Sequence, residues 1–189
     1  MRALITQRFT NTSVKIPPPA AGVRDAAVLL PLMDRAQTLS VLLTQRTQHL
    51  HNHAGQISLP GGIIETTDAG PVAAALRETE EEIGISPAQV DVVGQLDAVE
   101  TFTGFRIMPV VGFVAPDIEL RLDRFEVESA FEVPLDFIVD PRNYERRTRH
   151  WRNQDVSYYV LNYEGRVIWG ATAEILASFV RRLGLAGSY

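Results

Sequence analysis

The chain has 189 residues, 46% of them hydrophobic and 22% charged, and its net charge is −5. This length and composition are typical of one soluble globular domain, and no apolar run approaches the ~20 residues that a membrane helix needs. The sequence holds no cysteine, which excludes disulfides, thiolate metal sites and cysteine nucleophiles. We expect a cytoplasmic protein without a secretory signal, because Met1–Thr10 contains neither an apolar segment nor a cleavage site of that type.

Basic residues are almost all arginines, and they form no dense stripe of the kind that binds nucleic acid. Neither nucleic acid nor a membrane is therefore expected as a partner. The densest basic group lies near Asp136, Asp140 and Glu145, and this mixture predicts a solvated charged surface. Binding of an anionic ligand is the alternative. The group consists of Arg142, Arg146, Arg147, Arg149 and Arg152.

The chain is expected to divide into a loosely structured lead-in, residues 1–25, and a single domain, residues 26–189. Extended polyproline geometry is predicted at Pro17–Pro19. Short apolar runs then predict strands, and longer runs with one apolar face predict helices. In chain order these are strands at Ala26–Leu32, Leu39–Thr44 and Ile57–Leu59, a helix at Pro71–Ile83, strands at Val90–Val99, Arg106–Ala115 and Glu126–Val133, a hairpin of Val156–Tyr163 with Arg166–Trp169, and a final helix at Ala171–Leu183. This mixture predicts an α/β fold, an α/β/α sandwich around a mixed β-sheet.

Glutamates crowd the end of the first predicted helix, in the run from Arg77 to Gly84. At about 100° per residue, Glu78, Glu81 and Glu82 project together, whereas Glu80 points to water. Like charges at this spacing, and carboxylates near a helix C-terminus, are each unfavourable by roughly 0.2–1 kcal/mol. A divalent cation would reverse the repulsion, and carboxylate oxygens suit Mg²⁺ or Mn²⁺. A solvated acidic face is the alternative. The opposite face, expected in the core, carries Val72, Ala75, Leu76, Thr79 and Ile83.

A sharp turn precedes this helix at Pro60-Gly61-Gly62, because proline fixes φ and glycine permits positive φ. Without Cβ atoms, the backbone of Gly61 and Gly62 can approach a ligand closely. A tight turn alone says little about function. Next to the acidic helix, however, it predicts a place where phosphate oxygens and metal ions meet.

These residues resemble the signature of the Nudix hydrolases. The signature reads Gly-x5-Glu-x7-Arg-Glu, an aliphatic residue, x-Glu-Glu-x-Gly and an aliphatic residue. The chain departs from it in three ways: Asp68 stands at the first glutamate, the loop from Asp68 to Arg77 is one residue longer, and Thr79 replaces an aliphatic residue. The helix end, which carries the chemistry, is intact. The matching residues are Gly62, Arg77, Glu78, Glu81, Glu82, Gly84 and Ile85.

A second pattern is similar to the additional motif of the coenzyme A pyrophosphatases within this superfamily. That motif reads Leu-Leu-Thr-x-Arg-[Ser/Ala]-x3-Arg-x3-Gly-x3-Phe-Pro-Gly-Gly, and its spacing is kept from Leu42 to Gly62. Thr47, His51 and Leu59 replace Ser/Ala, Arg and Phe. The subfamily also carries an Asp-Ala pair in the loop and Trp-Gly-x-Thr-Ala at the start of the last helix. These stand here as Asp68-Ala69 and Trp169–Ala173, so the resemblance extends from about Ala26 to Leu183.

The resemblance implies metal-dependent hydrolysis of the diphosphate linkage of coenzyme A or its derivatives, to 4′-phosphopantetheine and 3′,5′-adenosine diphosphate. Two or three Mg²⁺ or Mn²⁺ ions would be held mainly by Glu78 and Glu82. Glu81 and the Gly61 carbonyl would support them, and Arg77 would orient Glu78. Either Glu81 or Glu126 would be the general base. Of the groups expected to bind the ligand, Arg46 would lie beside the 3′-phosphate, with Gly61 and Gly62 in the turn.

Two alternatives stay open from the sequence. One is a Nudix pyrophosphatase acting on ADP-ribose, NADH or nucleoside triphosphates, with the same metal chemistry and a different pocket. The other is a Nudix-fold ligand-binding module without catalysis, although such modules usually lose helix glutamates and all of them are present here. The expected partner is a small-molecule diphosphate substrate, and a homodimer is left open.

Overall fold

The computed structural model of the chain describes all residues except 11–13, 15–21, 36–37, 51–52, 152–153 and 186–189. Predictions that involve Pro17–Pro19, His51 or Arg152 therefore lie outside the described residues. In the part of the chain that is described, no helix combines the length and the apolar character that a membrane crossing requires.

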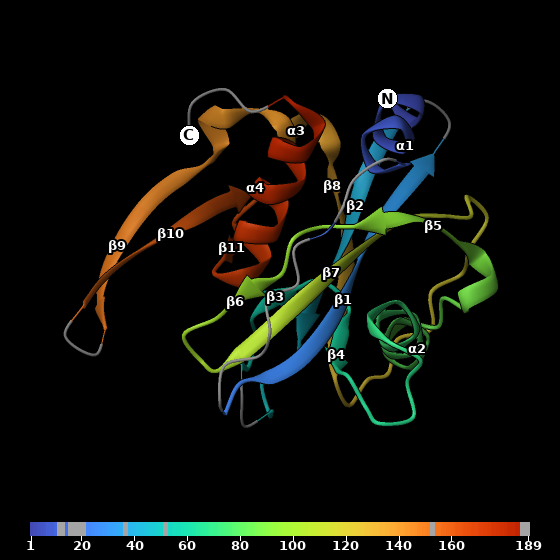
Figure 1. Cartoon of the computed structure of the whole chain (residues 1–189), viewed down its shortest axis with the longest axis horizontal. Helices are drawn as coiled ribbons and strands as arrows, with labels where there is room; N and C mark the ends of the chain where they lie inside the picture. Colours follow the sequence, from blue (N-terminus) through green and yellow to red (C-terminus); the bar gives the residue numbers. More distant parts are fainter. Residues whose placement is uncertain (11–13, 15–21, 36–37, 51–52, 152–153, 186–189) are drawn as a thin grey trace.

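A mixed sheet of eight strands forms the centre of the molecule (Figure 1). Its long strands β1 and β7 run parallel, from the pair Arg24 and Phe105 to the pair Met33 and Val114. The other pairings are antiparallel. The strands are β1 (Arg24–Arg35), β2 (Thr38–Arg46), β3 (Ile57–Ser58), β4 (Gly61–Ile63), β5 (Val90–Gln95), β6 (Val99–Glu100), β7 (Phe105–Val114) and β8 (Val127–Pro134).

A fork between β1 and β2 is the feature of the sheet that positions the glycine turn. The two strands pair only near their connecting turn, from Leu32 with Val41 to Arg35 with Thr38. Beyond that point β3 pairs with β2, and β4 pairs with β1. The Leu29 N–H also donates to the Pro60 carbonyl at 2.9 Å. Backbone hydrogen bonds therefore hold the segment from β3 to β4 between the diverging strands.

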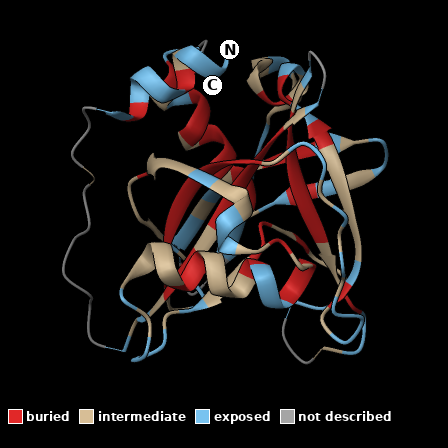
Figure 2. Ribbon diagram, turned by 90° about the vertical axis from the view of Figure 1, so that its right-hand side faces the viewer, coloured by how far each residue is buried: buried red, intermediate tan, exposed pale blue. Residues whose placement is uncertain are grey.

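Alternation along β1 places helices on both faces of the sheet. Ala27 and Leu29 pack with Ala74 and Ala75 of α2 (Pro71–Ile83). Leu30 and Leu32 belong to the larger core on the opposite face, with residues of α1 (Arg2–Thr10), α3 (Leu135–Val139) and α4 (Ala171–Leu183). Buried residues, red in Figure 2, run through the central strands and along α4. The predicted α/β sandwich with a mixed sheet is confirmed.

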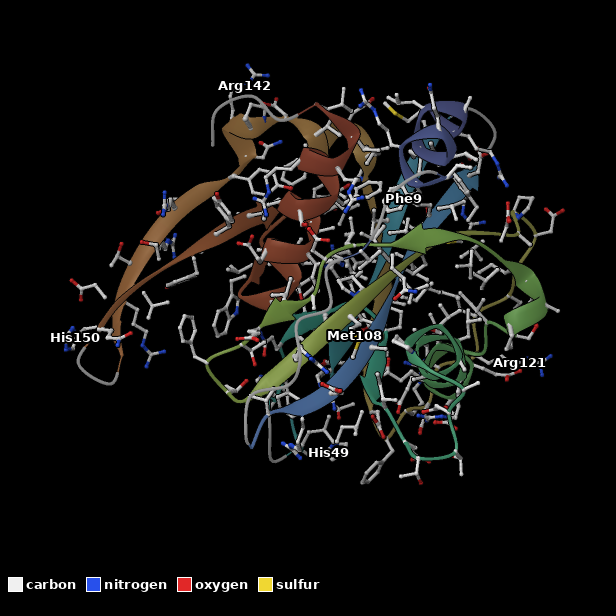
Figure 3. All side chains as sticks on the ribbon, in the orientation of Figure 1. Phe9, His49, Met108, Arg121, Arg142 and His150 are labelled. Carbon is white, nitrogen blue, oxygen red and sulfur yellow. The ribbon has the colours of Figure 1, made fainter. Side chains whose placement is uncertain are left out.

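A second sheet of three strands, in the order β11-β10-β9, projects away from α2 (Figure 1). It consists of β9 (Glu145–Trp151), β10 (Gln154–Tyr163) and β11 (Arg166–Trp169). The sequence predicted β10 and β11 but not β9. The arginines of β9 leave it without the apolar run from which the other strands were predicted. Arg147 of β9 pairs with Glu145 at 2.7 Å, and Arg142, just before β9, pairs with Asp140 at 2.6 Å. The labelled Arg142 and His150 lie far from α2 in Figure 3, so this group forms a charge-mixed surface.

The N-terminal segment and the run after Gly84 differ from the expectation. The expected loose lead-in contains the helix α1, whose Ile5 and Phe9 are buried in the main core, and this corrects the prediction for those residues. The boundary between residues 25 and 26 stays a prediction. The single strand expected at Val90–Val99 is two strands, β5 and β6, which are separated at residues 96–98. The pairing of β5 with β7 also shifts register between Val92 and Gly94.

Truncation of Phe9 tests whether α1 belongs to the domain. Phe9 is 6% exposed, and its ring centroid lies 6.1 Å from that of Phe179 in α4 (Figure 3). We expect Phe9→Ala to reduce the free energy of unfolding by about 3 kcal/mol and to lower Tm by roughly 6–12 °C. The exposed Gln7→Ala on the same helix is the control, read by thermal unfolding. Equal Tm values for both variants would show that α1 does not stabilise the core.

Candidate active site

The C-terminus of α2 is tied to the loop that precedes β8. The helix ends at Gly84, in the left-handed conformation at φ 76°, and the Gly84 N–H donates to the Glu80 carbonyl. The N–H groups of Arg121 and Asp123 donate to the carbonyls of Ile83 and Glu82, both at 2.9 Å. These bonds satisfy carbonyls that a helix end leaves free. They also bring the segment that carries Glu126 next to the acidic helix.

Arg77 is held by five hydrogen bonds to its surroundings. Its Nε and Nη2 donate to the two carboxylate oxygens of Asp68, each at 3.0 Å. Nη1 donates to Glu78 Oε1 at 2.9 Å and to Glu81 Oε2 at 3.1 Å, and Nη2 also reaches the Ile63 carbonyl at 3.2 Å. The planar guanidinium thus fixes Glu78 and Glu81 relative to the loop.

Asp68 takes the position of the signature glutamate, and the structure gives it a physical role. Besides binding Arg77, its carboxylate accepts the Glu65 N–H at 2.8 Å. The hydrogen bond from Arg77, reinforced by that N–H, lowers the pKa of Asp68. The ionised form of Asp68 is therefore favoured and anchors Arg77, and the longer loop is closed by this bidentate pair.

The three predicted glutamates differ widely in burial. The side chain of Glu82 is 5% exposed, that of Glu78 is 19% exposed, and that of Glu81 is 60% exposed. The expected core face is present, with Ala75, Thr79 and Ile83 buried and Val72 and Leu76 partly buried. Glu82 is buried together with these core residues, and the helical pattern did not predict this.

Glu82 is a buried carboxylate facing the glycine turn. Its Oε2 accepts the Gly61 N–H at 3.2 Å, and its Oε1 lies 3.6 Å from Arg46 Nη1. Burial raises the pKa of Glu82 to about 8, against the opposing effects of the Gly61 N–H and Arg46, and repulsion from Glu126 and Glu78 adds to the rise. Burial also raises the pKa of Glu78. The site therefore disfavours negative charge as long as no cation enters it.

The two positions of the turn require glycine for different structural reasons. A Cβ at Gly61, where φ is 147°, would lie 2.3 Å from the Ala27 carbonyl oxygen, so the backbone of β1 excludes a side chain there. A Cβ at Gly62 would instead lie 2.4 Å from the carboxyl carbon of Glu78. Gly61 therefore serves the fold, whereas Gly62 leaves room for a carboxylate.

Arg46 and Glu126 come from other elements and complete the site. Arg46 ends β2, and its Nη2 lies 3.8 Å from Glu126 Oε2. Thr47, one of the motif departures, holds the Glu126 segment: its N–H donates to the Glu126 carbonyl at 2.9 Å, and its hydroxyl donates to the Phe125 carbonyl at 2.8 Å. The sequence gave no role to Thr47, because the contact joins residues 78 positions apart.

The donor set suits a hard divalent cation. Glu78 and Glu82 supply only oxygen, and Gly62 admits a carboxylate against the backbone. Among the described residues, no three His, Cys, Asp or Glu side chains are already gathered as a metal site. Arg46 and Arg77 lie against the carboxylates instead. The ligand role of the Gly61 carbonyl and the identity of the general base remain predictions.

Comparison with known proteins identifies the family. The NUDIX domain matches residues 23–161. The chain belongs to the Nudix family. It is 41% identical over 162 residues to the "Uncharacterized Nudix hydrolase NudL" of Escherichia coli K12, which covers 86% of this chain and 84% of that protein. The Nudix hydrolase RenU of M. Smegmatis superposes with a TM-score of 0.53 at 25% identity, over 64% of this chain and 76% of its own.

A more distant solved structure agrees on the fold. The C. elegans Ap4A hydrolase superposes with a TM-score of 0.51 at 19% identity, over 59% of this chain and 80% of its own. The Nudix chain described here is accordingly a pyrophosphohydrolase with the fold of that family, and enzymes of this family generally use divalent metal ions.

Gly62→Ala tests the contact between the turn and Glu78. The added methyl displaces the Glu78 carboxylate, which is the end of a flexible side chain, so we expect kcat to fall by about 100-fold with a Tm change of only a few degrees. Gly61→Ala is the contrasting variant, because its methyl meets backbone and lowers Tm strongly. Steady-state kinetics and thermal unfolding distinguish the two. An active Gly62→Ala enzyme would contradict the placement of Glu78.

The raised pKa of Glu82 predicts how stability depends on pH without divalent metal. The folded state holds a proton on Glu82 that the unfolded chain releases above its ordinary pKa of 4.5. Stability therefore falls as pH rises from about 4.5 to 8, by up to about 1.4 kcal/mol per pH unit.

Glu82→Gln has no ionisable group at this position, so its stability lacks this pH dependence. In EDTA, the Tm of the variant minus the Tm of the wild type should therefore increase from pH 5 to pH 8. Saturating Mg²⁺ at pH 8 should reduce that difference, because the cation stabilises the ionised wild-type carboxylate. Parallel Tm curves for the two proteins in EDTA would show that Glu82 is already ionised at low pH.

Proposed function

We propose that this Nudix enzyme hydrolyses the diphosphate linkage of coenzyme A or its derivatives, giving 4′-phosphopantetheine and 3′,5′-adenosine diphosphate. The observation that supports this most directly is the motif from Leu42 to Gly62. The arginine of this motif, Arg46, lies beside the carboxylates of Glu82 and Glu126, so the motif and the Nudix signature meet in one site.

Glu78 and Glu82 would hold Mg²⁺ or Mn²⁺, with Glu81 and the Gly61 carbonyl in support. When bound, the metal supplies charge neutralisation on the diphosphate and a lowered pKa for an attacking water. Arg77 orients Glu78 through the bond to its Oε1, and Asp68 keeps Arg77 in place. Arg46 binds a phosphate of the substrate, and Gly61 and Gly62 let the substrate approach the backbone.

Two carboxylates are able to accept the proton of the water. Glu126 is 43% exposed and stands on a segment that Thr47 fixes, across the site from α2. Glu81 is more exposed and is bound to Arg77. We assign the general base to Glu126, since a positioned carboxylate that is free of Arg77 can receive a proton without loosening the Glu78 anchor.

The basic group on β9 has no part in this proposal. Arg147, on the sheet that projects away from α2 (Figure 1), and Arg142, just before that sheet, each pair with a neighbouring carboxylate. We place the enzyme in the cytoplasm, where coenzyme A is present, and propose a small-molecule diphosphate as its partner.

Product identification with coenzyme A and Mg²⁺ tests the proposal. We expect 4′-phosphopantetheine and 3′,5′-adenosine diphosphate in equal amounts, detected by mass spectrometry. Glu78→Gln should lower kcat by at least about 100-fold, because a ligand to the metal is lost. Glu80→Gln, an exposed residue on the same helix, is the matched control and should stay within about twofold of the wild type.

ADP-ribose, NADH and nucleoside triphosphates belong in the same assay. Turnover of one of these with no turnover of coenzyme A or its thioesters would replace the proposed substrate but keep the mechanism. Full activity of Glu78→Gln would overturn the mechanism itself.

A further inference from the structure

The two arginines of the site are held in very different ways. Arg77 makes hydrogen bonds of 2.9–3.2 Å to Asp68, Glu78, Glu81 and the Ile63 carbonyl. Arg46 lies 3.6 Å from Glu82 and 3.8 Å from Glu126, beyond the 2.7–3.2 Å range of a normal N–H···O hydrogen bond. Arg77 is thus locked in place, whereas Arg46 is attracted to its two carboxylates without being tightly bonded to either.

The backbone around Arg46 is fixed, so only its side chain is free to change partners. The Arg46 N–H donates to the Gln56 carbonyl at 3.0 Å, and the next residue, Thr47, is bonded to the Glu126 segment. The side chain of Arg46 is 25% exposed, and its long stem has several rotatable bonds. The guanidinium can therefore leave Glu82 and Glu126 without disturbing the fold.

Arg46 also occupies the place where a cation is needed. It contacts the most buried carboxylate of α2 on one side and the carboxylate from the β8 segment on the other. A divalent ion bound by Glu82 would compete with the positive charge of Arg46. Once separated from the carboxylates, a guanidinium at this position has the fork geometry that binds phosphate oxygens.

We propose that Arg46 is an internal counter-ion that divalent metal displaces. Arg46 lies between Glu82 and Glu126 in the metal-free enzyme, leaves them when the metal binds, and then takes the diphosphate of the substrate. This inference rests on the proposed function for its last step. It implies an order of binding, metal before diphosphate. The metal displaces the Arg46 guanidinium from the carboxylates, and the guanidinium is then free to bind the substrate.

Metal affinity without substrate gives a test that does not depend on turnover. We expect Arg46→Gln to bind Mn²⁺ about three- to tenfold more tightly than the wild type in an EPR titration, because a competing charge is removed. Arg46→Lys keeps the charge and should stay within about twofold of the wild type. Arg35→Gln is the matched control, since Arg35 pairs with Glu132 at 2.6 Å away from α2, and it should also stay within about twofold.

The same variants should change substrate binding in the opposite direction. With saturating Mn²⁺, we expect Arg46→Gln to raise the KM for coenzyme A at least about tenfold, and Arg46→Lys to raise it less, because an ammonium lacks the bidentate fork. Circular dichroism confirms that each variant is folded. Unchanged or weaker Mn²⁺ binding by folded Arg46→Gln would overturn the counter-ion role.

Failure of the proposed function would look different. If the wild type turned over no diphosphate but Arg46→Gln still bound Mn²⁺ more tightly, the counter-ion role would stand and the substrate assignment would fall. If the wild type hydrolysed coenzyme A and the KM was unaffected by Arg46→Gln, the transfer of Arg46 to the diphosphate would be wrong.

Discussion

The hydrogen bond from the Gly61 N–H to the buried carboxylate of Glu82 joins the sheet to the acidic helix. It exists because β1 and β2 diverge and admit the glycine segment between them, and because α2 packs across β1 and β4 on that face. The same burial makes the ionised form of Glu82 costly unless a cation is present. The contacts that hold the glycine turn against α2 are therefore the ones that bury the Glu82 carboxylate.

The departures from the family pattern become intelligible once their contacts are known. Asp68 is shorter than the glutamate it replaces, yet it binds Arg77 through both oxygens because the longer loop brings it close. Thr79 is fully buried, and its hydroxyl donates to the Ala75 carbonyl one turn back, so the polar group is satisfied within the helix. Thr47 fastens the Glu126 segment to the end of β2. Each of the three residues therefore has its polar side chain hydrogen-bonded within this fold.

Positive charge is distributed unevenly over the molecule, and this matters for substrate recognition. The arginines around β9 outnumber those at the site, but Arg142 and Arg147 are neutralised by carboxylates two residues away. Arg77 is committed to Asp68 and the helix glutamates. Arg46 is the loosely held cation beside the acidic cluster. Arg142 and Arg147 are thus paired with carboxylates, whereas the acidic site beside the glycine turn contains a loosely held arginine.

The helix α2, the turn before it and the family could be predicted from the sequence, because they depend on local spacing: glutamates three and four residues apart, adjacent glycines, and a glycine that ends the helix. The sequence did not determine that Glu82 is buried while Glu81 is exposed, or that α1 and β9 exist. Helical periodicity gives the direction of a side chain but not what covers it. The meeting of Arg46, Glu82 and Glu126 was likewise decided by tertiary structure, since pairing of β2 with β8 brings together residues that lie far apart in the chain.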